Sequence, residues 1–194
     1  MARTESTMLT LGTKAPAFTL PNTNGETVSL ADYSHSKGVV VMFICNHCPY
    51  VHHVREELSR MGRDYQNSDI AIIAINSNDV DKYPDDHPDR MRDEVENFDY
   101  VFPYLYDETQ DVAKAYGAAC TPDFFVFDAE QSLTYRGQLD GSRPGNDVAV
   151  TGTDLRAAID AVLVGKEPER EQKPSLGCNI KWREGNEPEY FAKP

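Results

Sequence analysis

Basic residues are scarce in this chain, and long apolar runs are missing from it. It has 19 Lys and Arg against 32 Asp and Glu, which gives a formal net charge of -13. Nucleic-acid phosphates and anionic membrane surfaces attract basic patches, so this balance argues against either as the main partner. No stretch of the sequence approaches the roughly 20 apolar residues that a membrane span needs. We therefore expect a partner that is neither nucleic acid nor membrane.

Cysteine is also uncommon, with four in 194 residues. The first eight residues contain no apolar segment of the length that a secretory signal requires, so we expect the chain to act in the cytoplasm. Its hydrophobic residues, 40% of the total, provide enough apolar material for a core without disulfide crosslinks. In a reducing compartment, paired cysteines are more often catalytic or metal-binding than structural.

Two continuous apolar runs predict neighbouring strands of a parallel sheet. Residues 39–44 and 70–75 are apolar without alternation, as expected for strands that are covered on both faces. Between them, apolar positions recur at helical spacing from Pro49 onward and predict an amphipathic helix. The order strand, helix, strand predicts a β-α-β unit.

The flanking segments predict the rest of one domain over residues 1–165, followed by a tail over residues 166–194 that packs on it. Asn22 to Gly25 predict the turn of a β-hairpin at the N-terminal edge, and Thr153 has the side chain of an N-cap. The remaining expected elements are a helix at 89–98, an extended piece at 102–106, a short helix at 112–116, an antiparallel pair at 124–127 and 133–136, and a last helix from Thr153.

Two cysteines stand at the first strand–helix junction, in Cys45-Asn46-His47-Cys48. The unpaired N–H groups and the macrodipole of a helix N-terminus favour a thiolate over a thiol. We expect Cys45 to be exposed at the strand end and to act as the nucleophile, and Cys48 to resolve the mixed disulfide. An imidazolium at His47 would stabilise the thiolate and make the pair more oxidising; a solvent-exposed His47 without a role is the alternative.

This order of elements, with a CxxC at the first strand–helix junction, resembles the thioredoxin fold. Residues 117–122 look like the loop that holds a cis-proline beside the dithiol in such proteins, with Thr121 and Pro122 as the matching residues. The segments that resemble a peroxiredoxin-related family of the redoxin or alkyl hydroperoxide reductase type are 12–20, 45–51, 120–123, 135–140 and 177–182. The resemblance implies an α/β, thioredoxin-like fold with a central mixed sheet flanked by helices.

A cis peptide before Pro122 would leave the neighbouring backbone free to pair with an extended substrate, and would crowd a metal bound by both thiolates. An ordinary trans turn is the alternative. Two family features are missing from the chain. Residues 39–44 contain no carboxylate to accept the proton of the second cysteine, as thioredoxins have. If Cys48 were a peroxidatic cysteine, Cys45 would replace the usual Thr and Val41 the usual Pro.

Three functions fit these residues. The first is a thiol-disulfide oxidoreductase that acts on a disulfide-bearing protein or small molecule and is recycled by a thiol reductant. The second is a thiol peroxidase that reduces hydroperoxides through a sulfenic acid at Cys48 or Cys45. The third is copper or zinc binding by the crowded cysteines and histidines, which include His52 and His53. Because adjacent helical residues diverge by about 100 degrees, we expect no metal, and no other cofactor is implied.

Two further cysteines are candidates for additional redox roles. Cys120 is next to Pro122 and could lie near the dithiol, and Cys178 in the tail could fold back to meet it. Two reduced, semi-buried thiols without a role are the alternative. Arg136 and Arg143 could support a thiolate or a peroxide, although such arginines are more often in surface ion pairs.

Overall fold

A five-stranded mixed sheet forms the centre of the protein, which we describe from a computed structural model over residues 3–191. The strand order is β6-β5-β4-β8-β9. Strand β4 pairs parallel with β5 and antiparallel with β8, and all its residues are buried, which accounts for its continuous apolar sequence. The strands are β4 (Gly38–Phe43), β5 (Ile70–Asn76), β6 (Tyr104–Tyr106), β8 (Asp123–Asp128) and β9 (Leu133–Gly137).

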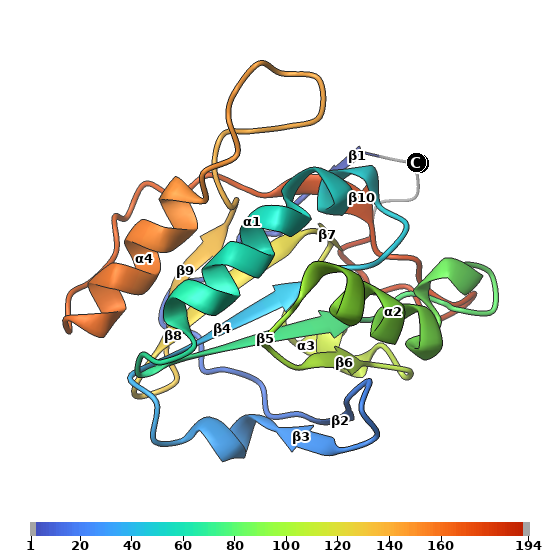
Figure 1. The fold of residues 1–194 in the computed structure, drawn as a ribbon, viewed down its shortest axis with the longest axis horizontal. Coiled ribbons are helices and arrows are strands. Elements are labelled where there is room, and N and C mark those ends of the chain that lie inside the picture. Colours follow the sequence, from blue (N-terminus) through green and yellow to red (C-terminus); the bar gives the residue numbers. More distant parts are fainter. Residues whose placement is uncertain (1–2, 192–194) are drawn as a thin grey trace.

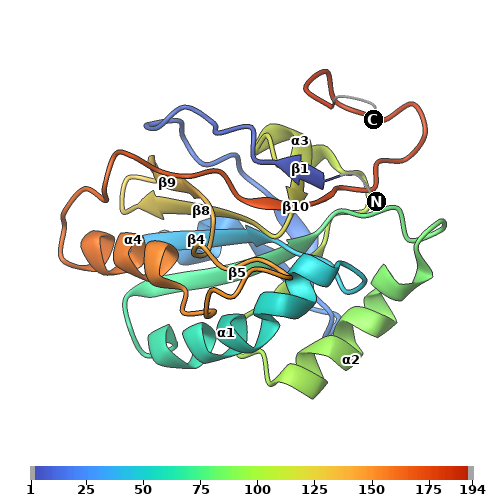
Figure 2. The same ribbon diagram turned by 90° about the horizontal axis from the view of Figure 1, so that it is seen from above.

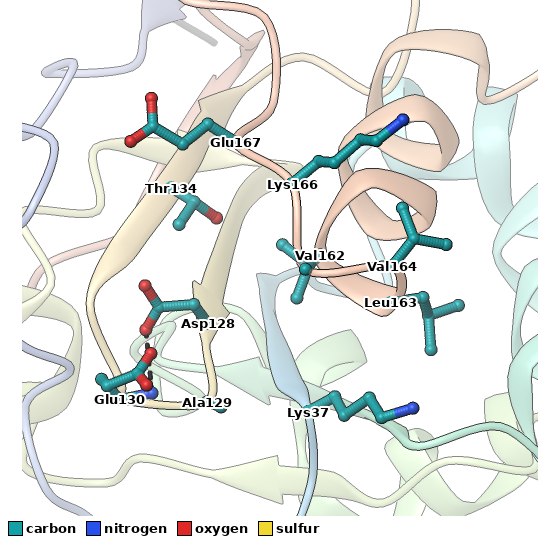
Figure 3. A pocket seen from close by; sticks show the side chains of 11 residues that line it. Lys37, Asp128, Ala129, Glu130, Thr134, Val162, Leu163, Val164, Lys166 and Glu167 are labelled. Carbon is teal, nitrogen blue, oxygen red and sulfur yellow. Dashed lines mark hydrogen bonds between the residues drawn. The ribbon is translucent and has the colours of Figure 1, made fainter.

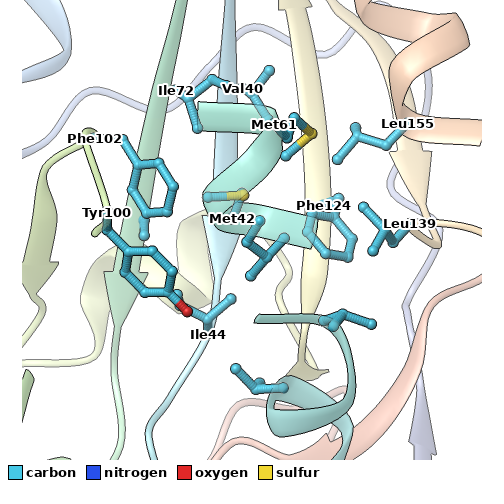
Figure 4. Close-up of a cluster of buried hydrophobic side chains, with 14 of the residues drawn as sticks. Val40, Met42, Ile44, Met61, Ile72, Tyr100, Phe102, Phe124, Leu139 and Leu155 are labelled. Atoms are coloured by element: carbon cyan, nitrogen blue, oxygen red, sulfur yellow. The ribbon is translucent and has the colours of Figure 1, made fainter. Parts of the chain in front are cut away.

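Helices α1 (Pro49–Tyr65), α2 (Pro88–Phe98) and α4 (Thr153–Leu163) lie on one face of this sheet (Figures 1 and 2). Alternate residues of β4 point to that face, where Val40 and Met42 pack with Met61 of α1 and Leu155 of α4 (Figure 4). The other residues of β4 face a second core around Tyr116 that includes Trp182. Helix α3 (Asp111–Ala115) lies on that side (Figure 2). The predicted α/β, thioredoxin-like architecture is therefore confirmed.

Two small sheets accompany the main one. Strands β2 (Thr19–Pro21) and β3 (Thr27–Ser29) form the predicted hairpin. It is a separate two-stranded sheet beside β6, the edge strand of the main sheet, and it contacts β6 through Asn22 and Thr23, which bond to Leu105 and Tyr104. Strands β1 (Arg3–Glu5), β10 (Leu176–Asn179) and β7 (Cys120–Thr121) form a three-stranded sheet that the sequence pattern did not predict.

The short 3-10 helices η1 (Leu30–Tyr33) and η2 (Pro84–Asp86) complete the elements. The prediction of Thr153 as an N-cap is wrong. Helix α4 is capped by Gly152, which has a φ of 67° and donates its N–H to Asp140 over 2.7 Å. A boundary after residue 165 stays a prediction, although β10 and Trp182 pack closely on the rest of the chain. Within residues 3–191, no helix is both long and apolar enough to cross a membrane.

Candidate active site

The Cys45–Cys48 segment lies between the end of β4 and the start of α1. Cys48 is the N-cap residue of α1, and Pro49 follows as its first helical residue, where the missing N–H is tolerated. Cys45 therefore precedes the helix by a turn of loop. Of the two sulfur atoms, Cys48 receives a helix amide, that of Val51 in the first turn of α1.

Thr121 holds both sulfur atoms. Its hydroxyl oxygen lies 3.2 Å from Cys45 Sγ, and its carbonyl oxygen accepts a hydrogen bond of 3.2 Å from Cys48 Sγ. The peptide bond between Thr121 and Pro122 is cis, as predicted. The structure therefore brings together all the residues of the predicted CxxC and Thr-Pro pair.

Burial contradicts the expected exposure of Cys45. Its side chain is 1% exposed and that of Cys48 is 0% exposed. The reason is that Cys45 continues the buried end of β4 and packs in the same core as α1. A hollow of about 560 Å³ lies at the other end of the sheet, between Lys37, Glu130 and Val164, and does not reach the dithiol (Figure 3).

The electrostatics of the pair also differ from the expectation. Burial raises the pKa of the Cys45 thiol, and its hydrogen bond to Cys48 and the charge of Asp86 raise this pKa further. The pKa of Cys48 is lowered, chiefly by hydrogen bonds from the thiols of Cys178 and Cys45, against the cost of its burial. The Val51 amide in the first turn of α1 adds to this effect. These interactions favour the thiolate at Cys48 and disfavour it at Cys45; the protonated Cys48 thiol instead donates to the Thr121 carbonyl.

Asp86 supplies the buried carboxylate that residues 39–44 lack. It is 0% exposed and comes from η2, about forty positions along the chain from the cysteines. One carboxylate oxygen accepts the backbone N–H groups of Asn46 and His47 over 2.8 and 3.2 Å. The other lies 2.6 Å from His47 Nδ1 and accepts a hydrogen bond of 2.8 Å from Asn78. Asp86 thus fixes the backbone between the two cysteines.

His47 is held between Asp86 and an aromatic ring. Its side chain is 13% exposed and stacks on Tyr83, with ring centroids 5.1 Å apart. Its Nε2 atom is buried without a hydrogen-bond partner. The alternative of a solvent-exposed His47 is therefore wrong. Asp86 was missed because it lies in an acidic loop that carries no local signal for a contact with the CxxC segment.

Possible metal ligands gather at the same place. Ligand atoms of Cys45, His47 and Asp86 all lie within 4.8 Å of one another. His52 Nε2 contacts the carbonyl of Asn46 instead, and His53 Nε2 lies 2.6 Å from Ser142 Oγ. The wider histidine cluster considered from the sequence is thus not assembled in this structure.

Of the two remaining cysteines, Cys178 reaches the dithiol. It lies on β10 directly opposite Thr121 of β7, in the same buried cluster as Cys48, and interaction with the Cys48 thiol raises its pKa. Cys120 is the neighbour of Thr121 on a strand, so its side chain points to the opposite face. Its sulfur lies 3.6 Å from the carbonyl oxygen of Pro122. Cys178 therefore meets Cys48 and not Cys120.

A second buried carboxylate lies beside Cys120. Burial raises the pKa of Asp123 to about 7, although Ser6 Oγ donates a hydrogen bond of 2.7 Å to it. The arginines considered from the sequence lie elsewhere. Arg136 donates to the carbonyl of Leu9, and Arg143 donates to Gln138 and to nearby carbonyl groups.

Comparison with known proteins identifies the family. Residues 11–136 match the AhpC/TSA family over more than half of the chain. The chain belongs to the AhpC/TSA family. A Mycobacterium tuberculosis protein named as a peroxiredoxin is 30% identical over 115 residues, which cover 59% of this chain and 68% of that protein. The thiol-disulfide oxidoreductase ResA of Geobacillus thermodenitrificans is 28% identical over 129 residues, or 64% of this chain and 67% of ResA.

Solved structures resemble this chain in fold. A crystal structure of an uncharacterized conserved protein from Geobacillus kaustophilus is 53% identical, with a TM-score of 0.92 over 94% of this chain and 97% of that one. The thioredoxin domain of a thiol-disulfide oxidoreductase from Bacteroides vulgatus is 18% identical, with a TM-score of 0.61 over 80% of this chain and 99% of that domain. The second likeness shows that this AhpC/TSA member has the thioredoxin fold.

Proposed function

We propose that this protein is a thiol-disulfide oxidoreductase in which Cys45 and Cys48 alternate between a dithiol and a disulfide. The observation that supports this most is the contact of both sulfur atoms with one residue, Thr121, at 3.2 Å each. The two thiols also lie in one buried cluster, and each shifts the pKa of the other. Both sulfur atoms are thus beside the same residue, as a pair that alternates between a dithiol and a disulfide requires.

In the proposed cycle Cys48 attacks and Cys45 resolves, which reverses the roles expected from the sequence. The Cys48 thiolate attacks a substrate disulfide, and one substrate sulfur leaves as a thiolate. Cys45 then attacks Cys48 Sγ, the Cys45–Cys48 disulfide forms, and the second substrate sulfur leaves. An external thiol reductant restores the dithiol.

Cys45 has to lose its proton before it attacks. Its pKa is raised chiefly by burial, so a nearby acceptor would speed this step. The side chains of His47 and Asp86 lie within 4.8 Å of Cys45 and are the acceptor that we propose. Asp86 orients the ring through the 2.6 Å contact with Nδ1 and is a positioning residue in this account.

An insulin-reduction assay with dithiothreitol tests the proposal. We expect Cys48→Ser to abolish the catalysed rate and Cys45→Ser to trap a mixed disulfide with the substrate. Cys120→Ser is the matched control, because Cys120 points away from the dithiol. An unchanged rate in Cys48→Ser would contradict the proposed function.

Membership of the AhpC/TSA family and the lowered pKa of Cys48 at a helix N-terminus also favour thiol peroxidase activity as a second candidate. In this reaction the Cys48 thiolate would become a sulfenic acid and then condense with Cys45. Rapid mixing with hydrogen peroxide decides between the two. If Cys48 oxidises within seconds at micromolar peroxide, the protein is a peroxidase. If Cys48 stays reduced, the protein is not an efficient peroxidase and the proposed thiol-disulfide exchange is retained.

The cytoplasm and a disulfide-bearing protein or small molecule remain the proposed compartment and partner. The proposal of the partner stands on the disulfide chemistry of the site.

A further inference from the structure

Strand β10 covers the edge at which an extended substrate was expected to pair. It runs antiparallel to β7, with Cys178 opposite Thr121 and Asn179 opposite Cys120. It also packs against α1 (Figure 1). The edge of β7 before Pro122 is therefore occupied by the chain itself, and the prediction that its backbone is free is wrong.

The approach of β10 to Thr121 depends on the absence of a side chain at Gly177. A Cβ atom at this position would lie 2.0 Å from the carbonyl oxygen of Thr121. This is the same carbonyl that accepts the hydrogen bond from Cys48. Close packing at Gly177 therefore places the next residue, Cys178, at the dithiol.

Cys48 interacts with the two other cysteines of this site. The thiols of Cys178 and Cys45 are the two largest causes that lower the pKa of Cys48. All three side chains belong to one buried cluster. Cys45 and Cys178 are therefore the two cysteines with which Cys48 can form a disulfide.

We propose that Cys178 is a third redox cysteine, which β10 presents to Cys48 in the place of a substrate cysteine. This inference rests on the proposed function, because it needs the Cys45–Cys48 disulfide. The mode of pairing is that of an added β-strand, in which backbone hydrogen bonds hold an extended segment and one side chain reaches the site.

The exchange is balanced without an added oxidant. The Cys178 thiolate attacks Cys48 Sγ of the Cys45–Cys48 disulfide, the Cys48–Cys178 bond forms, and the Cys45–Cys48 bond breaks. The electron pair leaves on Cys45, which takes up the proton that Cys178 has lost. One disulfide and one thiol are present before and after the step.

In the reduced protein the interaction with Cys48 keeps the pKa of Cys178 high, so its loss on oxidation of the dithiol would favour the Cys178 thiolate. The hydrogen bond to Cys48 is the largest cause that raises the pKa of Cys178, followed by burial and by the charge of Cys48. The first and third causes disappear once Cys48 is in a disulfide. The charge of Lys181, which lowers this pKa, then opposes burial alone.

Disulfide mapping of the full chain tests this inference. Wild type, Cys45→Ser, Cys178→Ser and the control Cys120→Ser are oxidised with diamide, blocked with N-ethylmaleimide in acid, digested and analysed by mass spectrometry. We expect Cys45→Ser to form the Cys48–Cys178 crosslink in most molecules. We expect Cys178→Ser to lose this crosslink completely and to keep the Cys45–Cys48 crosslink, and Cys120→Ser to match wild type.

The outcomes separate the inference from the function on which it rests. If Cys45→Ser yields no Cys48–Cys178 crosslink while wild type forms Cys45–Cys48, the third redox cysteine is refuted and the oxidoreductase stands. If Cys178→Ser forms no Cys45–Cys48 crosslink either, the proposed function fails. Circular dichroism of each variant checks the fold, and Cys178→Ala replaces Cys178→Ser if the hydroxyl disturbs β10.

Discussion

Replacing Gly177 by alanine should push β10 away from the dithiol. The new methyl group would lie 2.0 Å from the carbonyl oxygen of Thr121, whereas ordinary contacts begin at 3.4 Å. The obstacle is backbone, so β10 has to move outward by more than about 1 Å. Such overpacking typically costs about 1–3 kcal/mol, and each weakened strand hydrogen bond adds about 1 kcal/mol.

Two assays measure this effect. Urea unfolding should show a loss of about 2–4 kcal/mol in the free energy of unfolding of Gly177→Ala, by the overpacking and hydrogen-bond costs combined. Alkylation of the reduced protein with iodoacetamide, followed by peptide mapping, should show that Cys48 and Cys178 react at least several-fold faster than in wild type, since β10 no longer covers them.

Gly141→Ala is the matched control. It lies in an exposed loop with no atom within 4 Å of the position of a new Cβ, so both readouts should equal those of wild type. If Gly177→Ala is as stable as Gly141→Ala and its cysteines stay equally protected, β10 does not cover the dithiol and the reasoning is refuted.

Three further predictions concern the buried acids and metal binding. Asp86→Asn should lower the free energy of unfolding by about 2–3 kcal/mol in urea titrations, because the amide leaves at least one buried donor without an acceptor. The same variant should lower the pKa of Cys45, which would be measured as faster alkylation of Cys45 at fixed pH. Unchanged values in both assays would count against a positioning role for Asp86. The pKa of Asp123 is about 7 in the folded protein, against 3.8 for an unperturbed carboxyl group, so the folded protein binds its proton more tightly than the unfolded chain does. The contribution of this proton to stability is therefore complete below pH 3.8 and declines by up to about 4 kcal/mol as the pH rises through 7. Asp123→Asn should therefore be less sensitive to pH than wild type between pH 4 and 8 in parallel denaturant titrations, and equal pH dependence would disprove this assignment. After chelation and anaerobic purification, elemental analysis should find less than one zinc or copper ion per chain, because His47 Nδ1 and Asp86 already contact each other. One bound metal ion per chain, lost in Asp86→Asn, would instead favour a metal site at these residues.

Local patterns were sufficient to predict most of the main sheet and the helices. The apolar runs at 39–44 and 70–75 have the composition of strands covered on both faces, and they are β4 and β5 in the structure. Apolar spacing likewise predicted α1 from its first residue, Pro49. These elements can be predicted from the local sequence because the burial of a whole strand, or of one face of a helix, determines their pattern of apolar residues.

The three-stranded sheet could not be predicted in this way. Strand β7 has two residues and β10 has four, and neither shows a clear alternation. Their pairing joins positions more than fifty residues apart and depends on the close approach at Gly177. Segments this short have no sequence pattern that indicates which distant segment they pair with.

The candidate site was predicted in its chemistry but not in its electrostatics. The motif identified both cysteines and the Thr121-Pro122 loop, since these follow from a family resemblance. Which sulfur carries the charge depends on where α1 begins and on Cys178, and both are decided by tertiary packing. Asp86 and its contact with His47 are likewise a product of the fold.

Equilibrium redox titration of the wild-type chain tests the central claim most directly. The protein is equilibrated in buffers of reduced and oxidised dithiothreitol, trapped in acid, and mapped by mass spectrometry for the peptide that links Cys45 and Cys48. We predict a single two-electron transition in this crosslink, which Cys120→Ser leaves unchanged. Absence of the crosslink at every potential, with both thiols still alkylated in the unfolded protein, would contradict the account.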